Sequence, residues 1–241
     1  MPAWTQQVSI SWGPPLVSFF EQKAAILRDL QDANLLRRFD VSEERVGVKV
    51  KDPLHHLIFT PEHVEVAALR PDADLEALAV AVGCVWERLR PTKVRRVDPE
   101  FQFLTPTDQT YDEARRHAGD RVTTWPANAG LQNLDFAVVF DLALEEPKSE
   151  IHVESGIVEQ QEAARRLAMR QSAVVEGAEI APTLFPMKSL PEVGVYGHQI
   201  WRIADLDLET QNDAFDLWSR AREKAEQINV AISERLLGDA K

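Results

Sequence analysis

Apolar and polar residues alternate along several stretches of the chain, which is the pattern of half-buried β-strands. The first stretch covers residues 8–12, and Gly13, Pro14 and Pro15 then end it because proline cannot donate a ladder hydrogen bond. Further strands are predicted at residues 46–51, 54–60, 63–69, 94–104, 135–144, 150–158 and 193–208. Only short turns separate the strands between residues 46 and 69, so we expect an antiparallel meander there.

Apolar residues at helical spacing predict the helices that lie between these strands. The first predicted helix is amphipathic and spans residues 16–38. A capping-box pattern at Thr210 and Asp213 begins a long C-terminal helix, and Gly238 ends it. The remaining helices are predicted at residues 72–90, at residues 108–118 with Thr107 as N-cap and Gly119 as terminator, and at residues 159–170.

These elements follow the same order twice along the chain: a strand, a helix, three strands and a helix. The order divides the chain into a first β-α-β-β-β-α unit at residues 1–91 and a second at residues 92–241, which ends in the long helix. We therefore expect an α+β fold in which antiparallel sheets carry helices on one face. The alternative is a single integrated α+β domain whose repeating order is accidental.

Several short motifs along the chain resemble those of a known group of proteins. They are Pro14-Pro15-Leu16 before the first helix, the strand at residues 96–104, and the late strand WRIADLDLE with its Asp-x-Asp, which leads into the last helix. In these features the chain resembles a family of sporadically distributed, uncharacterised bacterial proteins of about this length. The resemblance implies an α+β architecture and a bacterial context, and it implies no catalytic residues.

Composition narrows the class of protein further. The 241 residues include 39 acidic and 27 basic side chains, a formal net charge of −12, and 44% hydrophobic residues, which is typical of a folded chain and unlike disordered or fibrous ones. The basic residues form no continuous stripe, so we expect neither nucleic-acid nor anionic-membrane binding. No leader or long apolar run is evident, which predicts a cytoplasmic protein.

The single cysteine, Cys84, allows no intrachain disulfide. Its apolar neighbours Val82, Val85 and Trp86 indicate a small buried side chain on a helix, with a reactive thiol as the alternative.

Acidic residues on the late strands are the first candidates for chemistry. Asp205 and Asp207 are two positions apart and so share one face of a strand, to which Asp141 and His152 are added if their strands lie adjacent. Hard cations such as Mg²⁺ need several converging oxygen ligands, so this group predicts a metal-dependent hydrolase or phosphodiesterase-like enzyme. The alternative is an ordinary polar face of a sheet, which needs no cofactor.

No G-x-S-x-G elbow and no phosphate-binding glycine loop occurs in the sequence. We therefore favour a non-enzymatic interaction or regulatory protein that binds a protein partner or forms a homo-oligomer. Aromatic and arginine side chains are the usual interface anchors. The candidates are Trp4, Trp125, Phe215, Trp218 and Arg222. Core packing is the alternative for Trp218 and for Trp201, and a small-ligand binder that uses a curved sheet is a third possibility.

Overall fold

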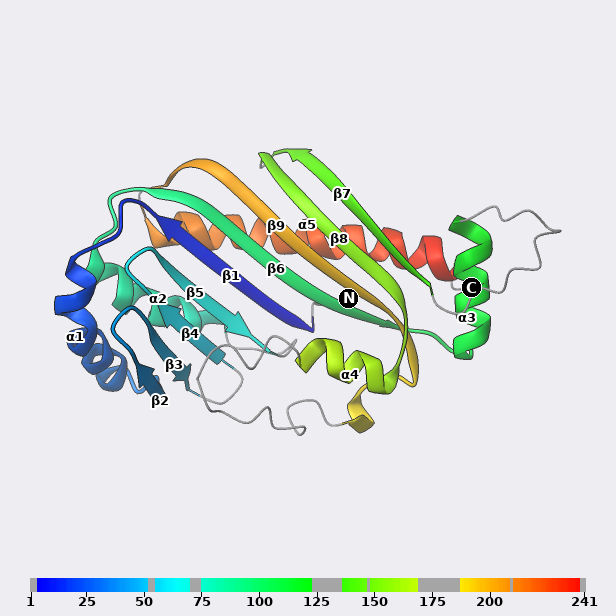
Figure 1. Ribbon diagram of the computed structural model, residues 1–241, viewed down its shortest axis with the longest axis horizontal. Helices are drawn as coiled ribbons and strands as arrows, with labels where there is room; N and C mark the ends of the chain where they lie inside the picture. Colours follow the sequence, from blue (N-terminus) through cyan, green and yellow to red (C-terminus); the bar gives the residue numbers. More distant parts are fainter. Residues whose placement is uncertain are drawn as a thin grey trace.

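The computed structural model describes residues 4–51, 55–69, 75–122, 136–146, 148–168, 187–208 and 210–238, with the side chains of residues 205 and 207 outside this description. Its central feature is one antiparallel sheet of nine strands in the order β2-β3-β4-β5-β1-β6-β9-β8-β7 (Figure 1). The strands are β1 (Thr5–Trp12), β2 (Leu36–Val41), β3 (Val46–Val50), β4 (His55–Phe59), β5 (His63–Ala68), β6 (Val94–Pro106), β7 (Ala137–Glu145), β8 (Lys148–Glu159) and β9 (Val193–Leu208).

The sheet order reflects the two halves of the chain. In each half the strands that follow the first helix fold back as a meander until the last of them pairs with that half's own first strand, β5 with β1 and β9 with β6. The antiparallel pairing of β1 with β6 then joins the two halves into a single sheet. The predicted α+β fold and the antiparallel meander over residues 46–69 are confirmed.

One face of the sheet carries the helix layer. The long α5 (Gln211–Leu237) crosses behind β6 and β9, and α2 (Leu75–Leu89) lies behind the first half beside α1 (Ser18–Asp32) (Figure 1). Alternate strand residues point into this layer, as Val8 and Trp201 do, and they form the main hydrophobic core with the apolar sides of these helices.

The opposite face, which we call the open face, carries one α-helix in the described part of the chain, with the short 3-10 helix η2 (Met187–Ser189) beside it. This helix, α4 (Gln160–Ala168), packs Ala163 and Leu167 against Leu104, Val158 and Tyr196 near one end of the sheet (Figure 1). The prediction that helices pack on one face is therefore correct for the main layer, and α4 is the addition to it.

The first predicted helix runs too far. It ends at Asp32, and residues 36–41, which the prediction assigned partly to the helix, form the edge strand β2 instead. The change of direction occurs at Asn34, whose φ of 56° lies in the left-handed region that asparagine tolerates better than most residues. Pairing with β3 then fixes Leu36–Val41 as a strand.

The helix predicted at residues 108–118 is also displaced. The structure places α3 at Tyr111–Val122, so the helix continues through Gly119, which is buried within it. Its cap is Thr110, whose hydroxyl and backbone N–H both donate to Glu113, while Thr107 accepts from the Gln109 N–H before the helix begins. The capping box at Thr210 and Asp213 is confirmed.

Among the described residues, no helix is both long enough and apolar enough to cross a bilayer.

Candidate functional site

Polar side chains gather on the open face of strands β6 to β9, and strand register brings them together. Glu100 on β6 pairs with Ile200 on β9, which pairs with His152 on β8, which in turn pairs with Asp141 on β7. Directly opposite residues of antiparallel strands point to the same face, so this row presents its side chains on one surface. A second row, two residues along, places Arg202 opposite Glu150.

Carboxylates and imidazoles alternate across these strands, and we call this set the carboxylate–imidazole chain. Nδ1 of His152 lies 2.9 Å from Oδ1 of Asp141, and Nε2 of His198 lies 2.7 Å from Oε1 of Glu100. Glu154 stands between the two imidazoles, 3.7 Å from Nε2 of His152 and 3.9 Å from Nδ1 of His198. The five groups therefore form one continuous series of close approaches from β6 to the edge strand β7.

One end of the carboxylate–imidazole chain is buried and the other end is exposed to solvent. The side chains of His198 and Glu100 are only 8% and 10% exposed, whereas that of Asp141 is 85% exposed. Next to the buried end, the amide of Gln102 donates to the Tyr196 hydroxyl at 2.8 Å. The buried end is thus held by hydrogen bonds, while the exposed end is accessible to solvent and to other molecules.

His152 lies toward the exposed end, and two neighbouring carboxylates shift the pKa of its imidazole. The hydrogen bond to Asp141 raises the pKa of the His152 imidazole above its ordinary value, and Glu154 adds to the increase. Both carboxylates favour the protonated ring because it gains an ion pair that the neutral ring lacks. His152 therefore holds its positive charge to a higher pH than a free histidine does.

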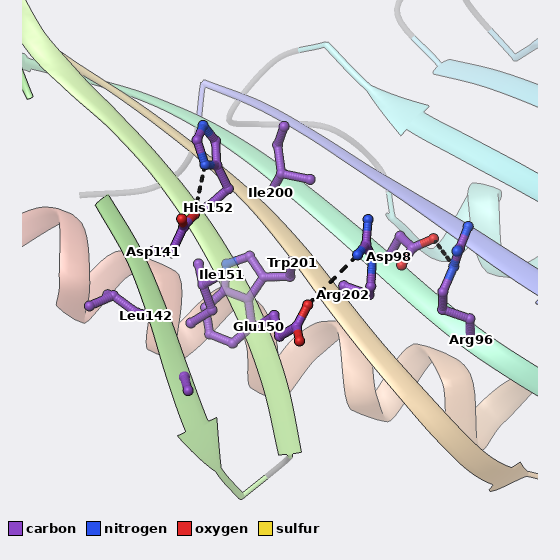
Figure 2. Close-up of a pocket in the computed structure, with 11 residues that line it drawn as sticks. Arg96, Asp98, Asp141, Leu142, Glu150, Ile151, His152, Ile200, Trp201 and Arg202 are labelled. Carbon is purple, nitrogen blue, oxygen red and sulfur yellow. Dashed lines mark hydrogen bonds and ion pairs between the residues drawn. The ribbon is translucent and has the colours of Figure 1, made fainter. Parts of the chain in front are cut away.

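A hollow of about 670 Å³ opens beside His152, and we call it the charged hollow. It crosses β6, β9, β8 and β7, and its charged side chains meet in pairs, Arg96 with Asp98, Arg202 with Glu150 and His152 with Asp141 (Figure 2). The lining consists of Arg96, Asp98, Asp141, Leu142, Ala143, Glu150, Ile151, His152, Ile200, Trp201 and Arg202.

The two arginines of the hollow are held differently. Nε of Arg96 lies 2.6 Å from Oδ2 of Asp98, a close ion pair, whereas Nη1 of Arg202 is 3.7 Å from Oε2 of Glu150. The side chains of Arg202 and Glu150 are 63% and 78% exposed, and exposed ion pairs of this kind contribute little stability. Arg202 can therefore leave Glu150 for a bound anion at small cost.

Asp98 lines the hollow from β6, opposite Arg202 in the register set by the neighbouring pairs of β6 and β9. Burial raises the pKa of the Asp98 carboxyl, although the attraction of Arg96 opposes the increase. Within the described part of the chain, its Oδ1 atom is buried and has no hydrogen-bond partner. Burying a carboxylate oxygen without a hydrogen bond costs free energy of folding. The packing of the sheet therefore does not explain why an aspartate stands at position 98.

The structure brings together two of the four residues predicted as metal ligands, Asp141 and His152. The side chains of Asp205 and Asp207 lie outside the described residues, so their part of the predicted metal site stays a prediction. Along β9, position 205 is five residues beyond Ile200, the partner of His152, a step of about 16 Å. No group of three or more His, Cys, Asp or Glu residues that could hold a metal ion occurs among the described side chains.

The candidate interface anchors are mostly packed. Trp218 is 3% exposed and Trp201 is fully buried, so the core interpretation is correct for both, and Trp218 is not a surface anchor. Phe215 is partly buried against the Trp218 ring, and Arg222 lies 3.9 Å from Glu226 on the same helix.

Trp4 and Trp125 were the other two candidate anchors. Trp4 is partly buried beside α4, and its indole N–H donates to the carbonyl of Leu104. Trp125 lies outside the described residues.

The predicted constellations omit several charged residues of the site, among them Arg96, Asp98, Glu100, His198 and Arg202. Each occupies an alternate position in a strand that the hydrophobic pattern identifies, so the sequence indicates on which face of the strand the side chain lies. The order β6-β9-β8-β7 was the missing information, because it makes neighbours of strands that are far apart in the chain.

Comparison with models of known protein families gave no match, and comparison with curated proteins gave none either. The resemblance to the bacterial family stays a prediction.

Proposed function

We propose that the protein is a non-enzymatic binding protein whose charged hollow holds a small extended zwitterion. The observation that carries this proposal is the hollow itself, about 670 Å³ in volume and lined by charges of both signs in pairs. Ligand pockets usually measure about 300 to 1,000 Å³.

Arg202 is the group that would hold the anionic end of the ligand. Its guanidinium is largely exposed and only loosely paired with Glu150, so a carboxylate gains two parallel hydrogen bonds at little cost. Arg96 is less available because Asp98 already holds it at 2.6 Å.

Asp141 would hold the cationic end. One of its carboxylate oxygens accepts from His152, and the side chain is exposed, which leaves the second oxygen for an ammonium group. Asp141 lies two strands and two residues from Arg202, a separation of about 12 Å between backbone positions. A peptide of three residues with free ends spans about 10 Å, so it matches this spacing.

Isothermal titration calorimetry with triglycine tests the proposal. We expect triglycine to bind, and its N-acetylated, C-amidated form to bind much more weakly because both end charges are removed. Arg202→Gln should weaken triglycine binding by roughly tenfold or more. The matched control is Arg220→Gln, which makes the same change at an exposed position on α5, on the far side of the sheet.

Two results would overturn this function. One is the absence of any heat of binding with triglycine. The other is equal binding by Arg202→Gln and Arg220→Gln, which would place the ligand elsewhere. The cytoplasmic location and the bacterial context stay predictions from the sequence.

A further inference from the structure

His152 lies between the two groups that would hold the ends of the ligand. It stands directly opposite Asp141 on β7, and two residues along β8, Glu150 stands opposite Arg202 on β9. A ligand that joins these two ends therefore crosses β8 over His152 and Glu150, which both line the charged hollow (Figure 2). The charge on the His152 ring acts directly on such a ligand.

The cationic end of the ligand and the proton of His152 compete for one carboxylate. Nδ1 of His152 lies 2.9 Å from Oδ1 of Asp141, so an ammonium group on the second oxygen of that carboxylate would stand about 5 Å from the ring. Two positive charges at that distance repel each other. The His152 side chain is 40% exposed, so it can lose its proton to solvent and still donate from Nδ1 to Asp141.

On the basis of the function proposed above, we propose that the charged hollow exchanges a proton for its ligand, so that an ammonium group binding at Asp141 displaces the proton of His152. The proton leaves from Nε2, which faces Glu154 at 3.7 Å, and passes to solvent. By linkage, the hollow binds its ligand more tightly as pH rises and releases it as the medium becomes more acidic.

The carboxylates beside His152 place this exchange close to neutral pH. The hydrogen bond to Asp141, with a further contribution from Glu154, raises the pKa of the His152 imidazole above its ordinary value of 6.5. In the free protein the ring therefore keeps its proton at a pH where an ordinary histidine has lost most of it. A bound ammonium group opposes these carboxylates and lowers the pKa of the ring again. Binding then releases a proton in the pH range between the two values.

Other charged side chains face the His152 ring from its own strand and from β9. Arg202 keeps its charge throughout and is engaged by the anionic end of the ligand. The side chain of His198 is only 8% exposed and lies 2.7 Å from Glu100, so it is shielded from the ligand. Besides Asp141, the facing groups are Glu150 and Glu154 on β8, and His198 and Arg202 on β9.

Across the hollow, Asp98 would give the opposite pH dependence. It lines the hollow from β6 together with Arg96, and burial raises the pKa of its carboxyl. Its negative charge lies opposite Arg202, where the anionic end of the ligand binds, so loss of the Asp98 proton as pH rises should weaken binding. The sign of the pH dependence therefore separates His152 from Asp98.

Calorimetry with triglycine, in two buffers of different ionisation enthalpy, measures the protons released on binding. From about pH 5.5 to about pH 7, below the titration of an α-amino group at about 7.7 to 8.0, we expect a fraction of a proton to be released. Over the same range the affinity should rise roughly threefold to fivefold, because the repulsion is screened by solvent. N-acetyl-triglycine keeps the carboxylate but has no ammonium group, so its binding should release no proton.

His152→Gln removes the titrating group and keeps an amide donor for Asp141. We expect this variant to release no proton when it binds triglycine, and its affinity should not rise with pH. His117→Gln is the matched control, because it makes the same change at an exposed position on α3, outside the lining of the hollow. It should release protons as the wild type does. Circular dichroism of both variants checks that they fold.

Failure of the exchange and failure of the proposed function give different results. If triglycine binds without releasing protons, or if His152→Gln releases as many as the wild type, the exchange is overturned and the binding function stands. An affinity that falls as pH rises also overturns the exchange, because Asp98 would then be the titrating group. The absence of binding at every pH overturns the function and the exchange together. If His152→Gln does not fold, triglycine and N-acetyl-triglycine compared on the wild type still decide.

Discussion

Gly197 on β9 lies directly against Asn229 on α5, so closely that a Cβ at position 197 would be 2.5 Å from Oδ1 of the asparagine. Asn229 is itself buried and donates from Nδ2 to the hydroxyl of Thr105 on β6. The absence of a side chain at residue 197 is what lets α5 approach the sheet at this point.

Gly197→Ala should therefore lower the free energy of unfolding by about 1 to 3 kcal/mol, because the added methyl group forces the helix or the asparagine to move. Urea unfolding followed by tryptophan fluorescence measures the change. The control is a double-mutant cycle with Asn229→Ala, in which the loss from Gly197→Ala should shrink once the asparagine is gone. Additive losses would show that Asn229 is not the obstacle.

Asp141→Asn should bring the pKa of the His152 imidazole down toward its ordinary value, because it removes the largest cause of the increase. Since the folded-state pKa of His152 is raised, the stability it contributes is complete below the pKa of the unfolded chain. That stability is lost as pH rises through the folded-state pKa. A histidine-selective NMR titration measures the pKa directly. Glu145→Gln, on the same strand, is the matched control and should leave the His152 titration unchanged.

The elements that could be predicted from the sequence are those whose signals are local. The helix α5 has its capping box at Thr210 and Asp213 and a long apolar stripe, and β9 is found with the same bounds as the predicted strand. Strand β2 could not be predicted in this way, because residues 33–38 continue the helical spacing of apolar positions. The reversal at Asn34 is fixed by pairing with β3, a contact that the local pattern does not contain.

The candidate site shows the same division. The sequence places Asp141 and His152 on neighbouring strands of a hairpin, so their contact could be expected. Glu100 and His198 are 98 residues apart, and only the order of β6 and β9 in the sheet makes them partners. Alternation shows which face a residue occupies, but it carries no information on which strand lies next to it.

Thr110→Ala should destabilise the protein by about 1 kcal/mol, because it removes the cap that α3 uses. The backbone N–H of Glu113 then loses its acceptor, and the Glu113 carboxylate loses a donor. Thr110→Ser keeps the hydroxyl and is the matched control, which should unfold at nearly the wild-type urea concentration. Equal losses in both variants would mean that the threonine methyl group, and not the cap, is responsible.

Asp98→Asn should become more stable relative to the wild type as pH rises from the acid range toward neutrality. Burial raises the folded-state pKa of Asp98, so the folded protein holds this proton to a higher pH than the unfolded chain does. Stability therefore falls as pH rises through the window between the ordinary value of 3.8 and the raised folded-state pKa, and the asparagine variant lacks this fall. Urea unfolding at a series of pH values measures the difference. Asp216→Asn, an exposed change on α5, is the matched control for the substitution itself.

The thiol of Cys84 should react slowly in the folded protein. It lies on α2, partly buried against the main core, and burial raises the pKa of the Cys84 thiol, with Asp29 and Glu87 adding to the increase. The thiolate is the reactive form, so a raised pKa leaves little of it at neutral pH. Reaction with a chromogenic disulfide reagent should therefore be much slower in the native protein than in urea, and should accelerate as pH rises toward the raised pKa. Equal rates in both states would show that Cys84 is an accessible, reactive thiol and would revive that alternative.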